Sequence, residues 1–209
     1  KRQNINLKKK KKVYLEDSQY FIEEVRKKVI DDLTYEKVYK QGFNINTPIN
    51  LELQKISTIS LRKGLIEYDK RKGWRGALTN KNYSKNWFEG LEKYNLEKSI
   101  GWEISIVKEV NKFSAKIETI SNFQGTINYN DITWTKKELE DLLRPGDIIY
   151  VKKINQKEYS LKQLPKINGG IIIMDPYTGR VLALTGGFSF KNSEFNRVTQ
   201  ALRQPGSAF

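Results

Sequence analysis

Apolar residues recur at helical spacing near the start of the chain. The residues that set this pattern are Ile22, Val25 and Val29. They lie three and four positions apart, which predicts an amphipathic helix over 18–33 with one buried face. Asp17 or Ser18 is expected to cap its first turn, because short oxygen-bearing side chains accept hydrogen bonds from the free N–H groups of a helix start.

A second, longer helix is predicted over 51–72. Asn50 is its expected N-cap, and Gly73 is expected to end it. The stripe expected to be buried contains Leu53, Ile56, Ile59 or Ser60, and Leu65. Before this helix, residues 42–47 alternate between apolar and polar side chains, which predicts a short strand followed by a turn.

From about residue 74 to 165 the apolar pattern changes to a period of two. Five short strands are expected, over 102–106, 115–119, 123–127, 148–151 and 159–164. Ile132 and Trp134 continue the alternation after the third strand, and residues 136–143 have the pattern of a helix. Residues 87–96 have that of a helical insertion before the strands. This order predicts a small OB-like β-barrel.

Two further strands follow the glycine pair 169–170. They are expected over 171–174 and 181–184, with a turn over 175–179 between them and Gly186-Gly187 after the second. These glycines are expected to form turns, and no catalytic role is assigned to them. The predicted fold class is therefore α+β: a helical linker, an OB-like barrel insertion, and the first strands of an incomplete sheet.

The composition excludes several classes of site. The chain contains no cysteine and no histidine, so disulfides, Ser-His-Asp triads, Cys-His pairs and most zinc sites are absent. No metal or cofactor is expected. The longest apolar run, over 171–174, is much shorter than the roughly 18 residues that span a bilayer. No signal peptide is visible, and any membrane anchor is expected upstream of residue 1.

Positive charge is concentrated at the start of the chain. The net charge is +14, and residues 1–12 carry seven positive charges and no acid. Residues 1–17 are therefore predicted to be a disordered basic tail. Two interpretations stay open for it: a solvated linker, or attraction to anionic lipid headgroups or nucleic acid.

Four tryptophans stand in or near the predicted barrel: Trp74, Trp87, Trp102 and Trp134. Exposed aromatic side chains on OB barrels stack on single-stranded nucleic acids, so one hypothesis is a nucleic-acid-binding module. The other is that these rings pack in the core or at its rim, which the alternating neighbours of Trp102 and Trp134 favour.

A serine follows a Pro-Gly pair near the last residue of the chain. The stretch is Arg203-Gln204-Pro205-Gly206-Ser207-Ala208-Phe209. In active-site serine enzymes of the S-x-x-K type, a lysine three residues after the serine lies on the same helical face and serves as its base. That lysine would be residue 210, one position past the last residue. Ser207 is therefore the candidate nucleophile, without its base in this chain.

Several stretches, in this order, resemble class A bifunctional penicillin-binding proteins of the 1A type. They lie at 20–26, 47–54, 68–76, 170–187 and 195–207. The last stretch includes Asn196, Arg197 and Gln200, which are expected to support the active-site helix through packing and hydrogen bonds. The resemblance covers residues 20–209.

The resemblance implies a domain order. Residues 1–17 would be the basic tail, 18–73 a helical linker after a glycosyltransferase domain, and 74–165 the OB-like domain. Residues 166–209 would begin a transpeptidase domain with a serine β-lactamase-like sheet, cut at the active-site serine. Ser207 would be the acyl-enzyme nucleophile of the parent enzyme.

The resemblance also implies a function. The parent would polymerise lipid II and cross-link stem peptides by D,D-transpeptidation, and β-lactams would acylate it. The present chain would be an inactive fragment of this peptidoglycan synthase, serving as linker and docking module on the periplasmic side of the inner membrane. Its OB-like domain would be the place for a regulatory envelope protein. The alternative is the OB-type nucleic-acid-binding module; with the synthase, no nucleic-acid partner is expected.

Overall fold

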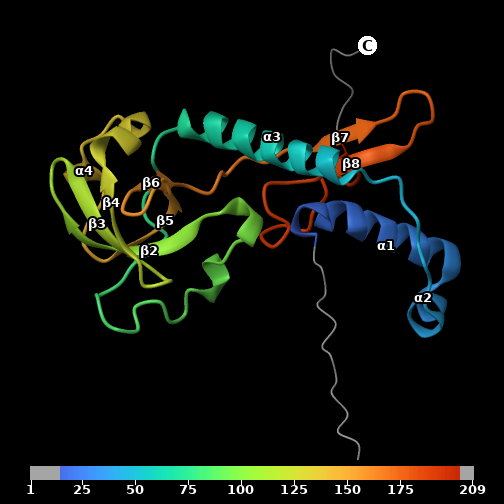
Figure 1. Ribbon diagram of the computed structural model, residues 1–209, viewed down its shortest axis with the longest axis horizontal. Helices are drawn as coiled ribbons and strands as arrows, with labels where there is room; N and C mark the ends of the chain where they lie inside the picture. Colours follow the sequence, from blue (N-terminus) through green and yellow to red (C-terminus); the bar gives the residue numbers. More distant parts are fainter. Residues whose placement is uncertain (1–14, 203–209) are drawn as a thin grey trace, which may run out of the picture.

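The computed structural model describes residues 15–202. A curled sheet forms one end of the molecule, a helix–hairpin body forms the other, and the helix α3 runs along the long axis between them (Figure 1). The helices are α1 (Gln19–Leu33), α2 (Tyr35–Gln41), α3 (Leu51–Lys70) and α4 (Leu139–Leu142). The strands are β1 (Thr79–Asn80), β2 (Glu103–Val110), β3 (Ser114–Thr119), β4 (Gln124–Asn128), β5 (Asp147–Lys153), β6 (Tyr159–Lys162), β7 (Ile171–Met174) and β8 (Val181–Thr185). The predicted α+β class is confirmed.

Helix α3 begins where the sequence predicts. The Asn50 side chain accepts hydrogen bonds from the N–H groups of Glu52 (3.0 Å) and Leu53 (3.1 Å), which confirms it as the N-cap. The helix ends at Lys70, two residues before the predicted end. A turn follows, and Gly73 adopts a positive φ of 78° that favours glycine.

The predicted buried stripe of α3 is largely wrong. Leu65 is buried, but Ile56 and Ile59 are 56% and 54% exposed. The face turned inward is polar and contains Gln54, Ser57, Thr58, Leu61, Leu65 and Asp69. Gln54 explains the reversal, because its side chain accepts from Leu184 N (2.9 Å) and donates to Leu184 O (3.1 Å). A buried amide side chain costs little free energy when the backbone of a strand forms hydrogen bonds with both its oxygen and its nitrogen.

Helix α1 is also confirmed, but its predicted cap and face are not. Neither Asp17 nor Ser18 caps it, because a 3-10 turn over Glu16–Ser18 precedes the helix. The backbone of Ser18 does not have the extended conformation that an N-cap residue usually adopts, and its side chain forms no capping hydrogen bond. Tyr20 and Phe21 are buried, whereas Ile22 is 50% exposed. The inward face is therefore set by the aromatic side chains.

Two elements before α3 differ from prediction. Helix α2 was not expected, and it follows α1 after Thr34, whose φ is 71°. Residues 42–47 are not a strand. Among the described residues no strand lies beside them to complete their backbone hydrogen bonds, so their alternation does not produce a sheet.

The residues between α3 and β7 form the OB-like barrel. Strands β2, β3 and β4 are an antiparallel meander, β5 pairs with β2, and β6 pairs with β5. A single parallel bridge joins Thr126 of β4 to Glu158, the residue before β6, so the sheet curls toward closure without a full ladder there. The interior consists of Val107, Ala115, Ile117, Ile127, Ile132, Leu139, Leu142, Leu143, Ile149, Val151, Tyr159 and Leu161.

Three expected features of the barrel are wrong in detail. Trp134 lies in a 3-10 turn over Thr133–Thr135, and the buried Ile132 lies between this turn and another over Tyr129–Asp131. The helix expected over 136–143 is only the single turn α4, because Lys136 has a φ of 57°. Residues 87–96 contain turns and a 3-10 segment in place of a helix, since Gly90 has a φ of 75°.

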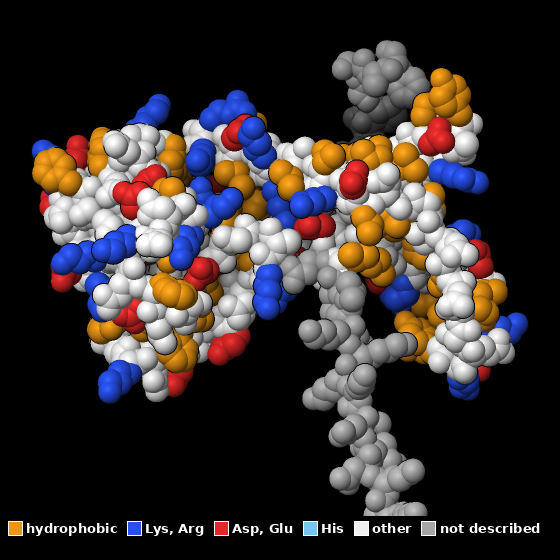
Figure 2. All heavy atoms as spheres, viewed as in Figure 1, with side chains coloured by type: hydrophobic (Ala, Val, Ile, Leu, Met, Phe, Trp, Pro, Cys, Tyr) orange, Lys and Arg blue, Asp and Glu red, His pale blue; other side chains and the backbone are white. Residues whose placement is uncertain are grey.

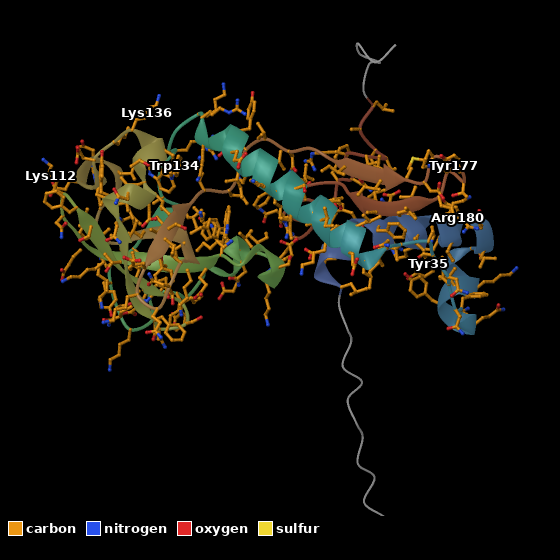
Figure 3. The ribbon with its side chains drawn as sticks, turned by 45° about the horizontal axis from the view of Figure 1, so that its top comes forward. Tyr35, Lys112, Trp134, Lys136, Tyr177 and Arg180 are labelled. Atoms are coloured by element: carbon orange, nitrogen blue, oxygen red, sulfur yellow. The ribbon has the colours of Figure 1, made fainter. Side chains whose placement is uncertain are left out.

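The hairpin β7–β8 is confirmed with its turn. Ile172 pairs with Leu184, and Ile173 with Ala183. In the turn, Asp175 accepts hydrogen bonds from Tyr177 N (2.9 Å) and the Thr178 hydroxyl (2.7 Å). Figure 3 shows Tyr177 and Arg180 at this tip, at the end of the molecule away from the barrel. Helices α1 and α3 both pack on β8.

One buried carboxylate joins α3 to both ends of the barrel insertion. Asp69 is 3% exposed. Its oxygens accept hydrogen bonds from Arg75 Nη1 (2.8 Å), Gln163 Nε2 (2.9 Å) and Lys166 N (3.1 Å). Arg75 lies where the chain enters the barrel, and Lys166 lies where the chain leaves it. Asp69 therefore holds the two segments that connect the barrel to the rest of the chain together at the end of α3.

Candidate functional site

Ser207 lies outside the described residues, which end at Leu202. We call residues 186–202 the serine-proximal segment. It follows β8 without regular helix or strand and passes between α1 and the start of the barrel (Figure 1). Side chains from α1, from the approach to the barrel and from the segment itself hold its backbone in place.

Asn196 is the centre of the hydrogen bonds within the segment. Its side chain is 1% exposed. It donates from Nδ2 to Glu24 Oε1 (3.1 Å) and accepts at Oδ1 from Val198 N (3.1 Å). Its backbone N–H donates to Gln200 Oε1 (2.7 Å), and its carbonyl accepts from Gln200 N (2.8 Å). These bonds fold residues 196–200 into a compact turn fixed to α1.

Two glycines allow the segment to approach its neighbours closely. A Cβ on Gly186 would lie 2.2 Å from Asn196 Oδ1, and one on Gly187 would lie 2.4 Å from the Tyr20 hydroxyl. Arg197 N donates to the Gly186 carbonyl (3.1 Å). Gly186 and Gly187 are therefore needed for close packing, in addition to the turn-forming role that the sequence predicts for them.

Tyr20 holds the middle of the segment from α1. Its hydroxyl donates to the carbonyls of Ser193 (2.7 Å) and Ser189 (3.2 Å). Burial raises the pKa of Tyr20 to about 12, although the nearby Arg197 guanidinium opposes the rise. The phenol therefore stays a neutral donor at physiological pH. Its ring meets Phe190 edge to face, with centroids 5.0 Å apart.

Glu97 holds the same stretch from the side of the barrel. It is 8% exposed, and it accepts hydrogen bonds from the Ser189 hydroxyl (2.6 Å) and Lys191 N (2.9 Å). Ser189 Oγ in turn accepts from Asn192 N (3.1 Å). Both functions of the Ser189 hydroxyl are thus used in positioning the backbone, which makes Ser189 a structural residue and not a second nucleophile.

Arg62 of α3 completes the contact between the three parts. Its guanidinium donates to the Phe188 carbonyl (2.9 Å) and the Ser99 hydroxyl (3.1 Å), and it pairs with Asp17 (3.3 Å). Burial lowers the pKa of Arg62, and Asp17 opposes this effect. The Phe188 ring packs against Trp102, with centroids 5.6 Å apart. The barrel, α3 and the serine-proximal segment therefore form one packed junction.

Among the described residues we find neither a metal-binding cluster nor a membrane-spanning helix. No group of three or more acidic residues among residues 15–202 is arranged to hold a metal ion. None of the helices described has the length and apolar character required to cross a bilayer.

The family model described as "Penicillin-binding protein OB-like domain" matches residues 74–167. Penicillin-binding protein 1A of Rickettsia prowazekii is 38% identical over 97% of this chain, and that of Pseudomonas aeruginosa is 31% identical over 83% of it. The chain covers 26% and 22% of those two proteins, respectively.

A solved structure agrees. The crystal structure of penicillin-binding protein 1A from Haemophilus influenzae matches 90% of this chain and 28% of its own, with a TM-score of 0.79 and 27% identity. The chain belongs to the penicillin-binding proteins of the 1A type. It spans about a quarter of the length of the relatives it matches.

This membership decides between the two hypotheses for the barrel. It is the OB-like domain of a penicillin-binding protein, and the nucleic-acid-binding alternative is wrong. The tryptophans agree with packing roles, because Trp87 is 2% exposed and the other three are partly buried against the apolar cores. Trp74 and Trp134 meet edge to face, with centroids 6.3 Å apart.

Sequence reasoning found part of this penicillin-binding protein junction. Asn196, Arg197 and Gln200 form hydrogen bonds within the serine-proximal segment and to α1. Their expected support of the active-site helix stays a prediction, because that helix lies outside the described residues. Glu97 was missed because it lies 92 residues from Ser189 and no local pattern marks it. Tyr20 and Glu24 carried a usable signal, since they are four residues apart on α1 and therefore share a face.

We expect Glu97→Gln to loosen the serine-proximal segment without unfolding the chain. The amide keeps the size of the carboxylate but weakens both charge-assisted hydrogen bonds. Backbone hydrogen exchange in residues 188–192 should become faster by about tenfold, measured by mass spectrometry on the whole chain. The exposed Glu92→Gln serves as control and should leave exchange there unchanged. Equal protection in both variants would show that Glu97 does not restrain the segment.

Proposed function

We propose that this chain is part of a peptidoglycan synthase and that residues 166–209 begin its D,D-transpeptidase domain. Ser207 would be the acyl-enzyme nucleophile. The observation that carries the proposal is similarity to penicillin-binding protein 1A over 97% of the chain. The sequence itself supplies the Gln204-Pro205-Gly206-Ser207 stretch. The restrained serine-proximal segment supports it, because acyl transfer requires a nucleophile held in a fixed position.

The chemistry would follow from a serine at the start of a helix. Ser207 Oγ would attack the carbonyl carbon of the penultimate D-alanine of a stem peptide, and its proton would pass to a lysine at position 210. As the tetrahedral intermediate collapses, that lysine would give the proton to the departing nitrogen, which releases the terminal D-alanine and leaves an acyl-serine. An amine of a second stem peptide would then take the acyl group and restore the hydroxyl. Backbone N–H groups near Ser207 would stabilise the negative oxygen.

The remaining parts of the proposal concern location and partners. Residues 18–73 would link the barrel to a glycosyltransferase domain that polymerises lipid II. The protein would be anchored upstream and would work on the periplasmic side of the inner membrane. Stem peptides and β-lactams would bind the transpeptidase domain, and an envelope protein would dock at the OB-like domain. The 209 residues alone would act as linker and docking module.

A fluorescent penicillin tests the nucleophile. A protein that continues past Phe209 with its encoded residues should be labelled covalently, and mass spectrometry should place the adduct on the Ser207 peptide. Ser207→Ala should abolish labelling, whereas Ser121→Ala, an exposed serine in the turn between β3 and β4, should leave it unchanged. Labelling of another serine, or a residue other than lysine at position 210, would refute the assignment of Ser207.

A further inference from the structure

A cleft separates α3 from the barrel. Its volume is about 370 Å³. Arg62, Ile66 and Lys70 line it from α3, Trp102 and Lys152 line it from the barrel, and Phe188 of the serine-proximal segment also lines it. Figure 2 shows Lys and Arg side chains gathered where α3 meets the barrel, with apolar side chains between them.

The rim of the cleft is strongly basic. Arg62, Lys63, Lys70 and Lys152 line it, and Glu67 is the one acid among the lining residues. Glu67 is 4.0 Å from Lys63, and both side chains are largely exposed, so this pair offsets little charge. Within residues 15–202, no carboxylate lies within ion-pairing distance of Lys70 or Lys152. Lys70 lies instead over the Trp134 ring, 5.6 Å from its centroid.

A third lysine adds to this uncompensated charge. Lys162 of β6 lies close enough to Lys70 and Lys152 to be affected by both. Burial, and after it repulsion from Lys70 and Lys152, lowers the pKa of Lys162 to about 8, although Asp131 opposes the change. Lys162 lines a neighbouring pocket and not the cleft itself. An anion bound in the cleft near Lys70 and Lys152 would offset their repulsion of each other and of Lys162, so this region attracts negative charge.

The floor of the cleft indicates which kind of anion fits. Ile100 and Phe188 are buried, and the half-buried Trp102 and Ile66 join them in an apolar cluster. From Ile59 to Lys70 the α3 side of the cleft is about 16 Å long. This length accommodates about five residues of extended peptide. A chain whose carboxylates reach the lysines while its apolar side chains face the floor matches both features.

We propose that the cleft between α3 and the OB-like barrel binds an acidic segment of a partner protein, with apolar side chains between its carboxylates. The charge complementarity and the apolar floor together select this occupant. The inference rests on the docking role proposed for the OB-like domain and does not depend on Ser207. Peptide binding and penicillin labelling can therefore fail independently.

The test is fluorescence anisotropy with the 209-residue chain. The probe is a fluorescein-labelled peptide of about six residues in which Glu alternates with Leu. We expect saturable binding that weakens as salt is raised. The double variant Lys70→Glu/Lys152→Glu should weaken binding at least about tenfold. Its melting temperature should fall by only a few degrees. Neither lysine forms an ion pair with a carboxylate among the described residues, so the contact of Lys70 with the Trp134 ring is the main interaction lost.

A control variant with the same change in charge distinguishes binding in the cleft from nonspecific attraction to a basic chain. Lys85→Glu/Lys112→Glu alters two exposed lysines outside the cleft, and Lys112 lies at the far end of the barrel (Figure 3). It should leave affinity within about twofold, as should deletion of residues 1–14. Equal weakening by both double variants would refute the proposal. So would equal binding of a peptide with Ser in place of Leu, or tighter binding of single-stranded DNA at the same lysines.

Discussion

Asp69→Ala should lower the free energy of unfolding by about 3 kcal/mol, as breaking one partner of a buried ion pair does. Asp69 accepts hydrogen bonds from Arg75, Gln163 and Lys166, and its removal takes the acceptor from these partly buried bonds. Because the three donors belong to the two segments that connect the barrel to the rest of the chain, the barrel should also lose its fixed orientation against α3. Urea denaturation of the whole chain measures the change.

Glu67→Ala is the matched control for this prediction. Glu67 lies two residues away on the same helix, but its side chain is 62% exposed and its ion pair with Lys63 is long. Its loss should cost less than about 1 kcal/mol. Asp69→Asn should fall between the two, since the amide keeps one acceptor oxygen. If Asp69→Ala is no more destabilising than Glu67→Ala, the junction is not held by this carboxylate.

Gly186→Ala should disorder the serine-proximal segment and destabilise the chain by about 2 kcal/mol. The added methyl would lie 2.2 Å from Asn196 Oδ1 and 2.9 Å from Asn196 Cα, so backbone as well as side chain must move. The hydrogen bonds from Asn196 to Glu24 and Gln200 should be lost with this movement. Hydrogen exchange over residues 196–200 should rise accordingly. In a protein that continues past Phe209, penicillin labelling should slow at least about tenfold.

Gly64→Ala provides a control of opposite sign. Gly64 is an exposed residue of α3, and no atom lies within 4 Å of an added Cβ. Alanine is the better helix former by about 1 kcal/mol, so this variant should be more stable than the parent chain. Exchange in residues 196–200 should be unchanged. A Gly186→Ala variant that behaves like Gly64→Ala would show that the segment does not require close approach at Gly186.

Part of the candidate site was predictable because its signals are local in sequence. Asn196 and Gln200 are one helical turn apart, and Gly186-Gly187 follows a strand directly, so a short stretch of sequence contains the inner contacts. Glu97 was not predictable in this way. Its partners lie 92 and 94 residues away, and nothing near it distinguishes a buried carboxylate from an exposed one.

The sequence by itself determined the elements whose cause is local: the Asn50 cap, the period-two strands of the barrel, and the turn over 175–179. It did not determine which face of α3 turns inward. The apolar positions Ile56 and Ile59 favoured one face, but Gln54 binds the backbone of β8 and buries the other. Only the tertiary structure decided this, because a polar side chain is buried at low cost when a distant strand supplies its hydrogen-bond partners.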